Sequence, residues 1–210
     1  MKFGSVRIAI LLVALRCTSL RIRILIIAAL AFTFVGTAWP YEDGAPPGHA
    51  GGFREPTCAA CHFDNDVNSV DGELTLDGVP ESFIPGHQYE FIIVMKHLML
   101  QSGGFQLTVR NIDGATAGEL SIVDKRAQIT TNSKSGRSYA QHSKDGTKAK
   151  TKGIISWLIR WHAPANEDKL IINVAANAAN DDASAFGDYI YFVEKKLKAA
   201  AQSNSIRLPQ

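Results

Sequence analysis

Three side chains that could do redox or metal chemistry stand within five residues of one another. They are Cys58, Cys61 and His62 of the stretch Cys-Ala-Ala-Cys-His. Two thiols at this spacing can close a disulfide, supply half of a zinc site or act as a redox dithiol. A histidine directly after them adds covalent haem attachment, because the thiols can add across the two vinyl groups while the histidine is held beneath the iron. The two intervening alanines are small and leave the approach of the ring open.

The rest of the chain helps to choose between these chemistries. A structural zinc site needs four ligands, and the third cysteine of the chain, Cys17, lies in a segment that we expect to be removed. A thioredoxin-like dithiol normally opens a helix in a βαβ unit, which this sequence lacks. A Cys58–Cys61 disulfide, or a zinc site completed by histidines, stays open as an alternative. The sequence favours one covalent haem c, with Cys58 and Cys61 as thioether anchors and His62 as the proximal iron ligand.

The second axial position of such an iron has three candidates. His142 lies in a stretch that reads as a polar loop between strands, and Met99 precedes a strand and would be a soft thioether ligand. His49 lies in a glycine-rich lead that could fold over the ring. Each has a simpler interpretation: a loop histidine bonded to backbone, a core methionine, or an exposed side chain. An iron without a second protein ligand would suit ligand sensing and remains a further alternative.

The first 38 residues predict export. Their only charges are five basic residues, and the 12-residue apolar run 24–35 is followed by the small residues Gly36, Thr37 and Ala38. This pattern is typical of a signal helix cleaved near Ala38, and the run is shorter than the roughly 20 apolar residues that span a bilayer. An earlier apolar run at 8–15 leaves an uncleaved anchor as the alternative. We expect a periplasmic, secreted or cell-surface protein.

Removal of this segment reverses the sign of the net charge. The full chain has 22 basic and 20 acidic residues, whereas residues 39–210 have 17 and 20, a net charge of −3. A mildly acidic exported protein gives no support to nucleic-acid binding.

The remaining chain divides into three predicted parts. Residues 39–70 are rich in glycine and proline and predict an irregular haem-attachment segment. Residues 71–194 contain short runs with period-2 alternation, separated by turn-forming pairs, which predict an antiparallel β-sandwich and hence a mainly β fold. Residues 195–210 predict a flexible tail that begins with a helical turn and then frays. The alternating runs lie at 89–95, 105–109, 120–122, 157–161, 170–174 and 189–193.

Five blocks between about Pro46 and Val193 occur in an order that resembles the reeler-type β-sandwich, in particular exported bacterial versions with a Cys-x-x-Cys-His motif ahead of it. The resemblance implies an immunoglobulin-like sandwich outside the cytoplasm and no defined enzymatic activity. Haem-free relatives also carry a histidine at the position of His142. The chain lacks the helices of a small cytochrome c, so the distal methionine of that fold is not carried over. The blocks are 85–95, 103–110, 139–147, 157–164 and 175–191.

Three other clusters carry weaker hypotheses. The basic segment Lys134–Lys152 reads as a solvated mobile loop or as a docking face for an acidic redox partner or for haem propionates. Asn180, Asp181 and Asp182, with Asp188 nearby, could bind calcium or form a turn. Trp157 and Trp161 share a strand face and predict core packing.

The sequence therefore predicts a mono-haem c-type electron-transfer protein rather than an enzyme, since no hydrolase or nucleotide-binding motif is present. The alternatives are a recognition or adhesion module in which the haem or a disulfide is structural, and a haem-based sensor with an open sixth site.

Overall fold

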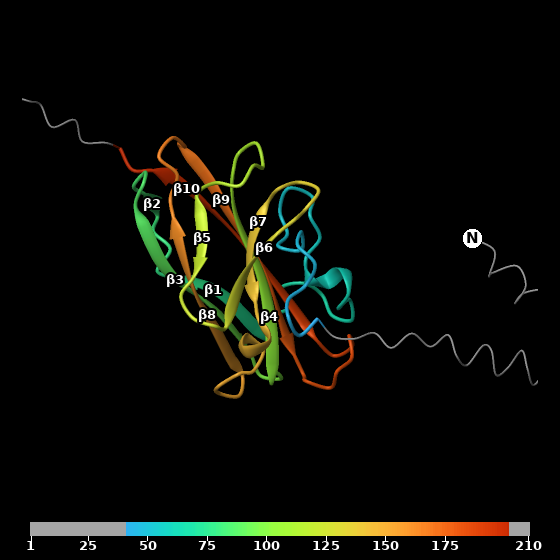
Figure 1. Cartoon of the computed structure of the whole chain (residues 1–210). Helices are drawn as coiled ribbons and strands as arrows, with labels where there is room; N and C mark the ends of the chain where they lie inside the picture. The colour runs from blue at the N-terminus through green and yellow to red at the C-terminus, as the bar shows by residue number, and fades with distance from the viewer. Residues whose placement is uncertain (1–40, 202–210) are drawn as a thin grey trace, which may run out of the picture. The chain divides into compact units, whose positions relative to one another are not determined.

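Ten strands form two facing sheets in the computed structural model, which describes residues 41–201 (Figure 1). The expected signal peptide or anchor at 1–38 lies outside the described residues. The strands are β1 (Gly72–Asp77), β2 (Ser82–Phe83), β3 (Gln88–His97), β4 (Ser102–Asn111), β5 (Glu119–Ile122), β6 (Ala127–Thr131), β7 (Ser138–His142), β8 (Ile154–His162), β9 (Lys169–Ala179) and β10 (Tyr189–Ala199). Two 3-10 turns, η1 (Cys58–Ala60) and η2 (Lys144–Gly146), complete the regular structure of these residues.

The smaller sheet has the strand order β1-β3-β8-β5, and the larger has the order β2-β10-β9-β4-β7-β6. The strand pairs are antiparallel except for the short β2, which pairs in parallel with β10. The predicted mainly β, antiparallel sandwich is confirmed. Within residues 41–201, no helix has the length and apolar character needed to cross a membrane.

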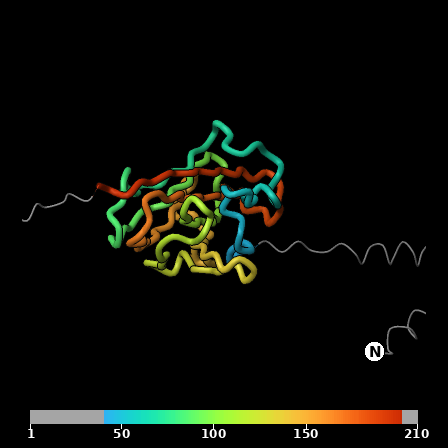
Figure 2. The backbone as a smooth tube through the Cα atoms, turned by 90° about the horizontal axis from the view of Figure 1, so that it is seen from above, coloured from blue at the N-terminus to red at the C-terminus, as the bar shows by residue number. Residues whose placement is uncertain are grey.

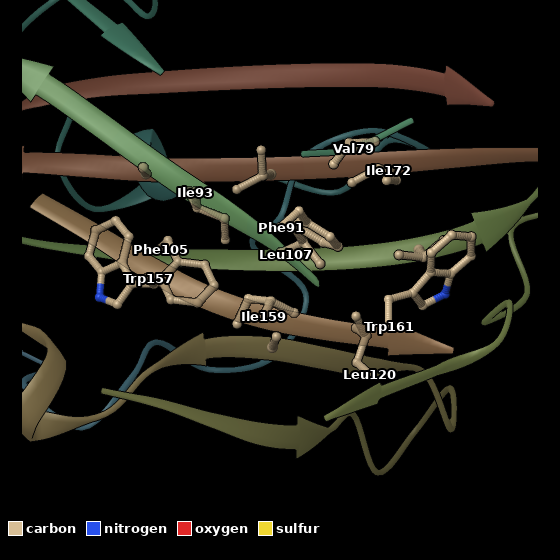
Figure 3. Packing of buried hydrophobic residues seen from close by; sticks show 14 of the residues in the cluster. Val79, Phe91, Ile93, Phe105, Leu107, Leu120, Trp157, Ile159, Trp161 and Ile172 are labelled. Atoms are coloured by element: carbon tan, nitrogen blue, oxygen red, sulfur yellow. The ribbon is translucent and has the colours of Figure 1, made fainter. Parts of the chain in front are cut away.

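The core lies between the two sheets (Figure 3). It contains the alternating apolar residues from which the sequence predicts strands. In β8, Trp157 and Trp161 are each 1% exposed, which confirms the core prediction for both. Their indole N–H groups donate to the carbonyls of Gly146 and Ala117, at 2.9 and 3.1 Å, so burial leaves neither unpaired. The facing sheet contributes Phe105 and others: Leu107, Val109, Leu170, Ile172 and Val174.

Strand β4 departs from its predicted environment. Its alternation of apolar and polar residues predicts a half-buried strand, but Gln106, Thr108 and Arg110 are all fully buried as well. The reason is that the glycine-rich lead, residues 41–57, lies over the outer face of the larger sheet (Figure 1, blue). The polar face of β4 therefore binds the lead.

Several boundaries of the prediction are wrong. The stretch containing His142 is strand β7, with four of its five residues buried, so neither a polar loop there nor one mobile loop across 134–152 exists. Residues 195–199 are the end of β10 rather than a helical turn or tail, because Lys195–Lys198 pair with β9 and Leu197 enters the core. Tertiary pairing here outweighs a local lysine- and alanine-rich composition. The short strands β1, β2, β6 and β7 were not predicted.

Residues 58–71 continue irregularly from η1 to β1. This segment (teal) runs beside β10 (red) in Figure 2. Asn68 bonds β10 three times: its amide to the Ile190 carbonyl, and its side chain to the amide and carbonyl of Phe192. These bonds tie the segment after the motif to the larger sheet.

Candidate functional site

A single cavity of about 690 Å³ gathers the residues of the Cys-x-x-Cys-His motif. Cys58, Cys61 and His62 all line it. The other walls come from the lead, the first half of β4, the end of β7 with the turn after it, and the end of β9 with the following loop. This volume lies within the roughly 300–1,000 Å³ that is usual for small-molecule and cofactor sites.

The motif is folded as a tight turn. Thr57 accepts the Ala59 amide on its hydroxyl at 3.2 Å, which caps the first turn of η1. The carbonyl of Cys58 then accepts the amides of both Cys61 and His62, at 3.2 and 3.1 Å. These local bonds, with the contact of η1 on β9, place both thiols and the imidazole along one cavity.

The two thiols are free and are not joined to each other. Although Cys58 as a residue is only half-buried, burial of its thiol raises its pKa to about 12. Reactive dithiols instead have a lowered thiol pKa, so the buried Cys58 thiol does not match a thioredoxin-like nucleophile. Among residues 41–201, no three His, Cys, Asp or Glu side chains gather in a way that could hold a metal ion.

His62 has a partner that the sequence did not suggest for it. Its Nδ1 lies 2.7 Å from Oδ2 of Asp188, a residue only 2% exposed that directly precedes β10. Asp188 also accepts the side chain of Asn177 at 3.0 Å and the amide of Asn180 at 3.2 Å. A carboxylate accepts only, so Nδ1 carries a proton, and in the neutral imidazole Nε2 then has the lone pair for a ligand. Metal-binding histidines are held by this kind of outer bond.

The motif and its histidine therefore fit a covalently attached haem. Neither thiol is in a disulfide, both cysteines line one cavity, and the histidine bonds Asp188 through Nδ1, which leaves Nε2 of the neutral imidazole for iron. Lys144 and Lys148 also line the cavity and could pair with carboxylates of a bound group.

The lead over the cavity is held by a buried glutamine. Gln106 accepts the amides of Gly48 and His49 on Oε1, at 2.8 and 2.6 Å. Its Nε2 donates to the Pro46 carbonyl and to Gln141, at 3.2 and 3.0 Å. Because Gln106 is 0% exposed, these bonds fix the backbone of the lead at His49.

A second anchor holds the residues just before the motif. The Glu55 carboxylate pairs with Arg110, accepts the Tyr139 hydroxyl at 2.7 Å, and lies 3.4 Å from Arg137. Arg110 is 0% exposed and lies 5.1 Å from the ring centre of Phe53. The hydroxyl pKa of Tyr139 rises to about 12, through burial and its bond to Glu55.

The lead comes so close to β9 that glycine is needed at position 52. A Cβ on Gly52 (φ +70°) would lie 2.4 Å from the side chain of Asn173.

The three predicted distal ligands differ in their surroundings. His142 lines the cavity, but the Phe105 amide donates to its Nδ1 at 3.0 Å and its Nε2 donates to the Tyr41 carbonyl at 3.2 Å. Met99 lies in the β3–β4 turn, is 56% exposed and does not line the cavity. His49 lines the cavity, with Nδ1 donating to the Pro46 carbonyl at 2.8 Å.

The remaining clusters are largely used within the fold. Asp182 accepts the amide of Ser184 and the side chain of Asn180, which is the turn-forming alternative to calcium binding. Of the basic segment, Arg137 binds Glu55, and Lys144 lies 3.4 Å from Glu42. Asp188, which sequence reasoning grouped with a possible calcium loop, supports His62 instead. In the sequence, the one sign that Asp188 is held in place is its position between Gly187 and the predicted strand at 189–193.

No family model matches the chain, and no curated protein matches its sequence. Among solved structures, it is similar to the human F-spondin reeler domain, with 18% identity over 64% of this chain and 93% of that one and a TM-score of 0.43. A second structure, described as the Reelin-N domain of F-spondin, gives 18% identity, 69% and 96% coverage and a TM-score of 0.46. A cohesin module of a Clostridium perfringens family 33 glycoside hydrolase gives 11% identity, 63% and 100% coverage and a TM-score of 0.40. At these identities the similarity concerns the fold and not a ligand.

Proposed function

We propose that this protein is an exported β-sandwich binding protein whose ligand is one covalently attached haem c, and that it transfers electrons. The observation that carries the proposal is the opening of Cys58, Cys61 and His62 on one cavity, with His62 backed by the buried Asp188. A haem iron bound there supplies one-electron transfer between its ferric and ferrous states.

Each residue of the site has a defined task in this proposal. Cys58 and Cys61 form the thioether bonds, and His62 offers Nε2 as the proximal ligand. Asp188 holds the proton on Nδ1 of His62 and makes the imidazole a stronger donor. Lys144 and Lys148 offer positive charge to carboxylates of the bound group.

Electron transfer also needs a partner, and the basic residues offer a surface for one. Lys148, Lys150 and Lys152 lie on the turns that precede β8, next to the cavity rim formed by Lys144 and Lys148. We propose that an acidic redox protein docks over this rim, since charge complementarity raises the rate of encounter.

The test is a potentiometric titration of protein purified from a host with cytochrome c maturation, followed by its visible spectrum. A reversible one-electron transition of the haem spectrum is expected for the native sequence. The Cys58→Ala/Cys61→Ala variant should lack this transition, and native protein with no haem spectrum would overturn the proposal. The exposed His87→Ala variant is a matched control that should leave the transition unchanged.

A second function is favoured by the cavity itself. Its walls come largely from β4, β7, β9 and the anchored lead, so it is formed by the fold before any haem is added. In this function the protein is a recognition module that binds a small molecule, with the two thiols free or joined. Native mass spectrometry of the purified protein tests this second function. A haem-free protein that keeps a bound small molecule, seen as added mass, would favour it.

A further inference from the structure

Four side chains are candidates to complete the coordination of a haem iron opposite His62, and the structure separates them by their position and by the bonds that their donor atoms already make. The inference below rests on the proposed function, because it concerns the sixth ligand of the same haem.

His49 has the free donor atom. Its Nδ1 lies 2.8 Å from the Pro46 carbonyl, which can only accept, so the proton is on Nδ1. In the neutral imidazole the lone pair is therefore on Nε2, and within residues 41–201 only Nδ1 of this ring makes a hydrogen bond. The same division of roles holds in His62, where Nδ1 faces Asp188. Both imidazoles line one cavity in the tautomer that suits iron ligation.

The backbone of His49 is also held in place. Gln106 accepts the amides of both Gly48 and His49, and it donates to the carbonyl of Pro46, the same carbonyl that orients the His49 ring. Gln106 is completely buried and is itself fixed by Gln141 at 3.0 Å. A ligand on such a clamped loop loses little conformational freedom when it binds.

The competing donors are occupied or distant. His142 uses both ring nitrogens within the fold, to Phe105 and to Tyr41, and its burial lowers its pKa. Ligation by His142 would break the bond to the lead. Met99 does not line the cavity, and Lys144 is paired with Glu42.

We infer that His49 supplies the second axial nitrogen of the haem, so that the iron is held by His49 and His62 as a six-coordinate, low-spin centre. Two imidazole ligands give a lower reduction potential than an imidazole and a thioether. The glycine-rich lead is then part of the metal site and not only a linker.

The test compares native protein with His49→Ala, each carrying covalent haem verified by intact mass. We expect the ferric native protein to give a low-spin electron paramagnetic resonance signal. His49→Ala should give a high-spin signal, and added imidazole should restore the low-spin one. The imidazole rescue shows that the variant is folded and lacks only the ligand.

Four further variants complete the design. Met99→Leu and His87→Ala should keep the native spectrum, and His49→Met should stay low-spin with a raised potential. A low-spin spectrum retained by His49→Ala, or a high-spin spectrum in native protein, would overturn the inference while leaving haem attachment intact. Conversion to high spin by His142→Gln but not by His49→Ala would assign the ligand to His142. Protein without covalent haem would instead overturn the proposed function.

Discussion

The imidazole of His62 and the carboxylate of Asp188 lie 2.7 Å apart, although His62 follows η1 and Asp188 directly precedes the last strand. The pairing depends on the fold, because Asn65 also reaches the Asp188 carbonyl at 2.9 Å and Asp64 accepts the Gly187 amide at 3.0 Å. The segment that follows the motif is thus fastened to the β9–β10 loop at the place where the carboxylate stands.

In the proposed haem protein, replacement of Asp188 by asparagine should raise the reduction potential. The amide keeps the shape of the carboxylate but removes the negative charge that strengthens His62 as a donor to ferric iron. A change of tenfold to a hundredfold in the preference for ferric over ferrous iron corresponds to about 60 to 120 mV for one electron. The measurement is a spectroelectrochemical titration of Asp188→Asn beside the native protein.

Asp182→Asn is the matched control for that change. Asp182 lines the same cavity and carries the same charge, but it bonds Ser184 and Asn180 and not His62. The reduction potential of Asp182→Asn should therefore shift by much less than that of Asp188→Asn. Equal shifts in the two variants would mean that Asp188 acts only through its charge at a distance, against the role assigned to its bond with His62.

Glu55 should be essential for holding the lead on the sheet. Glu55→Ala leaves the charge of Arg110 buried without its carboxylate, and Nε and Nη1 of Arg110 make no hydrogen bond within the described residues. Breaking a buried ion pair in this way costs about 3–5 kcal/mol. Urea unfolding should show this loss in the free energy of unfolding.

An exposed glutamate provides the comparison. Glu81 is 95% exposed and lies 3.1 Å from Lys195, so Glu81→Ala should change stability by about 1 kcal/mol or less. If Glu55→Ala were as stable as Glu81→Ala, the Arg110 pair would not anchor the lead.

Stability should fall on mild acidification. Burial lowers the pKa of His142, and it also lowers that of His97, so the folded state binds these protons less readily than the unfolded chain. Below the unfolded pKa of about 6.5 the unfolded state therefore carries more protons, and the free energy of unfolding decreases as the pH falls through this window. The urea midpoint should be lower at pH 5.5 than at pH 7.5.

His142→Gln should flatten this dependence, since the substitution removes one of the two titrating groups. Exposed His87→Ala should leave the slope unchanged. A slope that His142→Gln leaves at its native value would show that buried His142 does not cause the acid sensitivity.

Gly104 should resist any side chain. A Cβ at this position in β4 would lie 2.4 Å from Cε1 of His142, in the wall of the cavity. Gly104→Ala should therefore destabilise the protein by about 1–3 kcal/mol, as overpacking does. Thermal unfolding measures the effect, with Ser102→Ala on the same strand as the control. An unchanged melting temperature for Gly104→Ala would show that His142 is free to move away.

Period-2 alternation was sufficient to locate β3, β8, β9 and β10, because alternate residues of the runs 89–95, 157–161, 170–174 and 189–193 are apolar and pack in the core. The same alternation predicts that the polar residues of β4 face solvent, which is wrong because the lead covers them. Local spacing identified the Cys58–His62 motif. It could not identify Asp188 or the clamp by Gln106, because these contacts form only when strands distant in sequence come together.

The most direct test of the central claim is the intact mass of the native protein exported from a strain with cytochrome c maturation. We predict a mass one haem, about 616 Da, above the polypeptide after any signal cleavage, and its loss in Cys58→Ala/Cys61→Ala. A mass equal to the polypeptide less two protons, with no haem absorption, would contradict the claim and identify a Cys58–Cys61 disulfide.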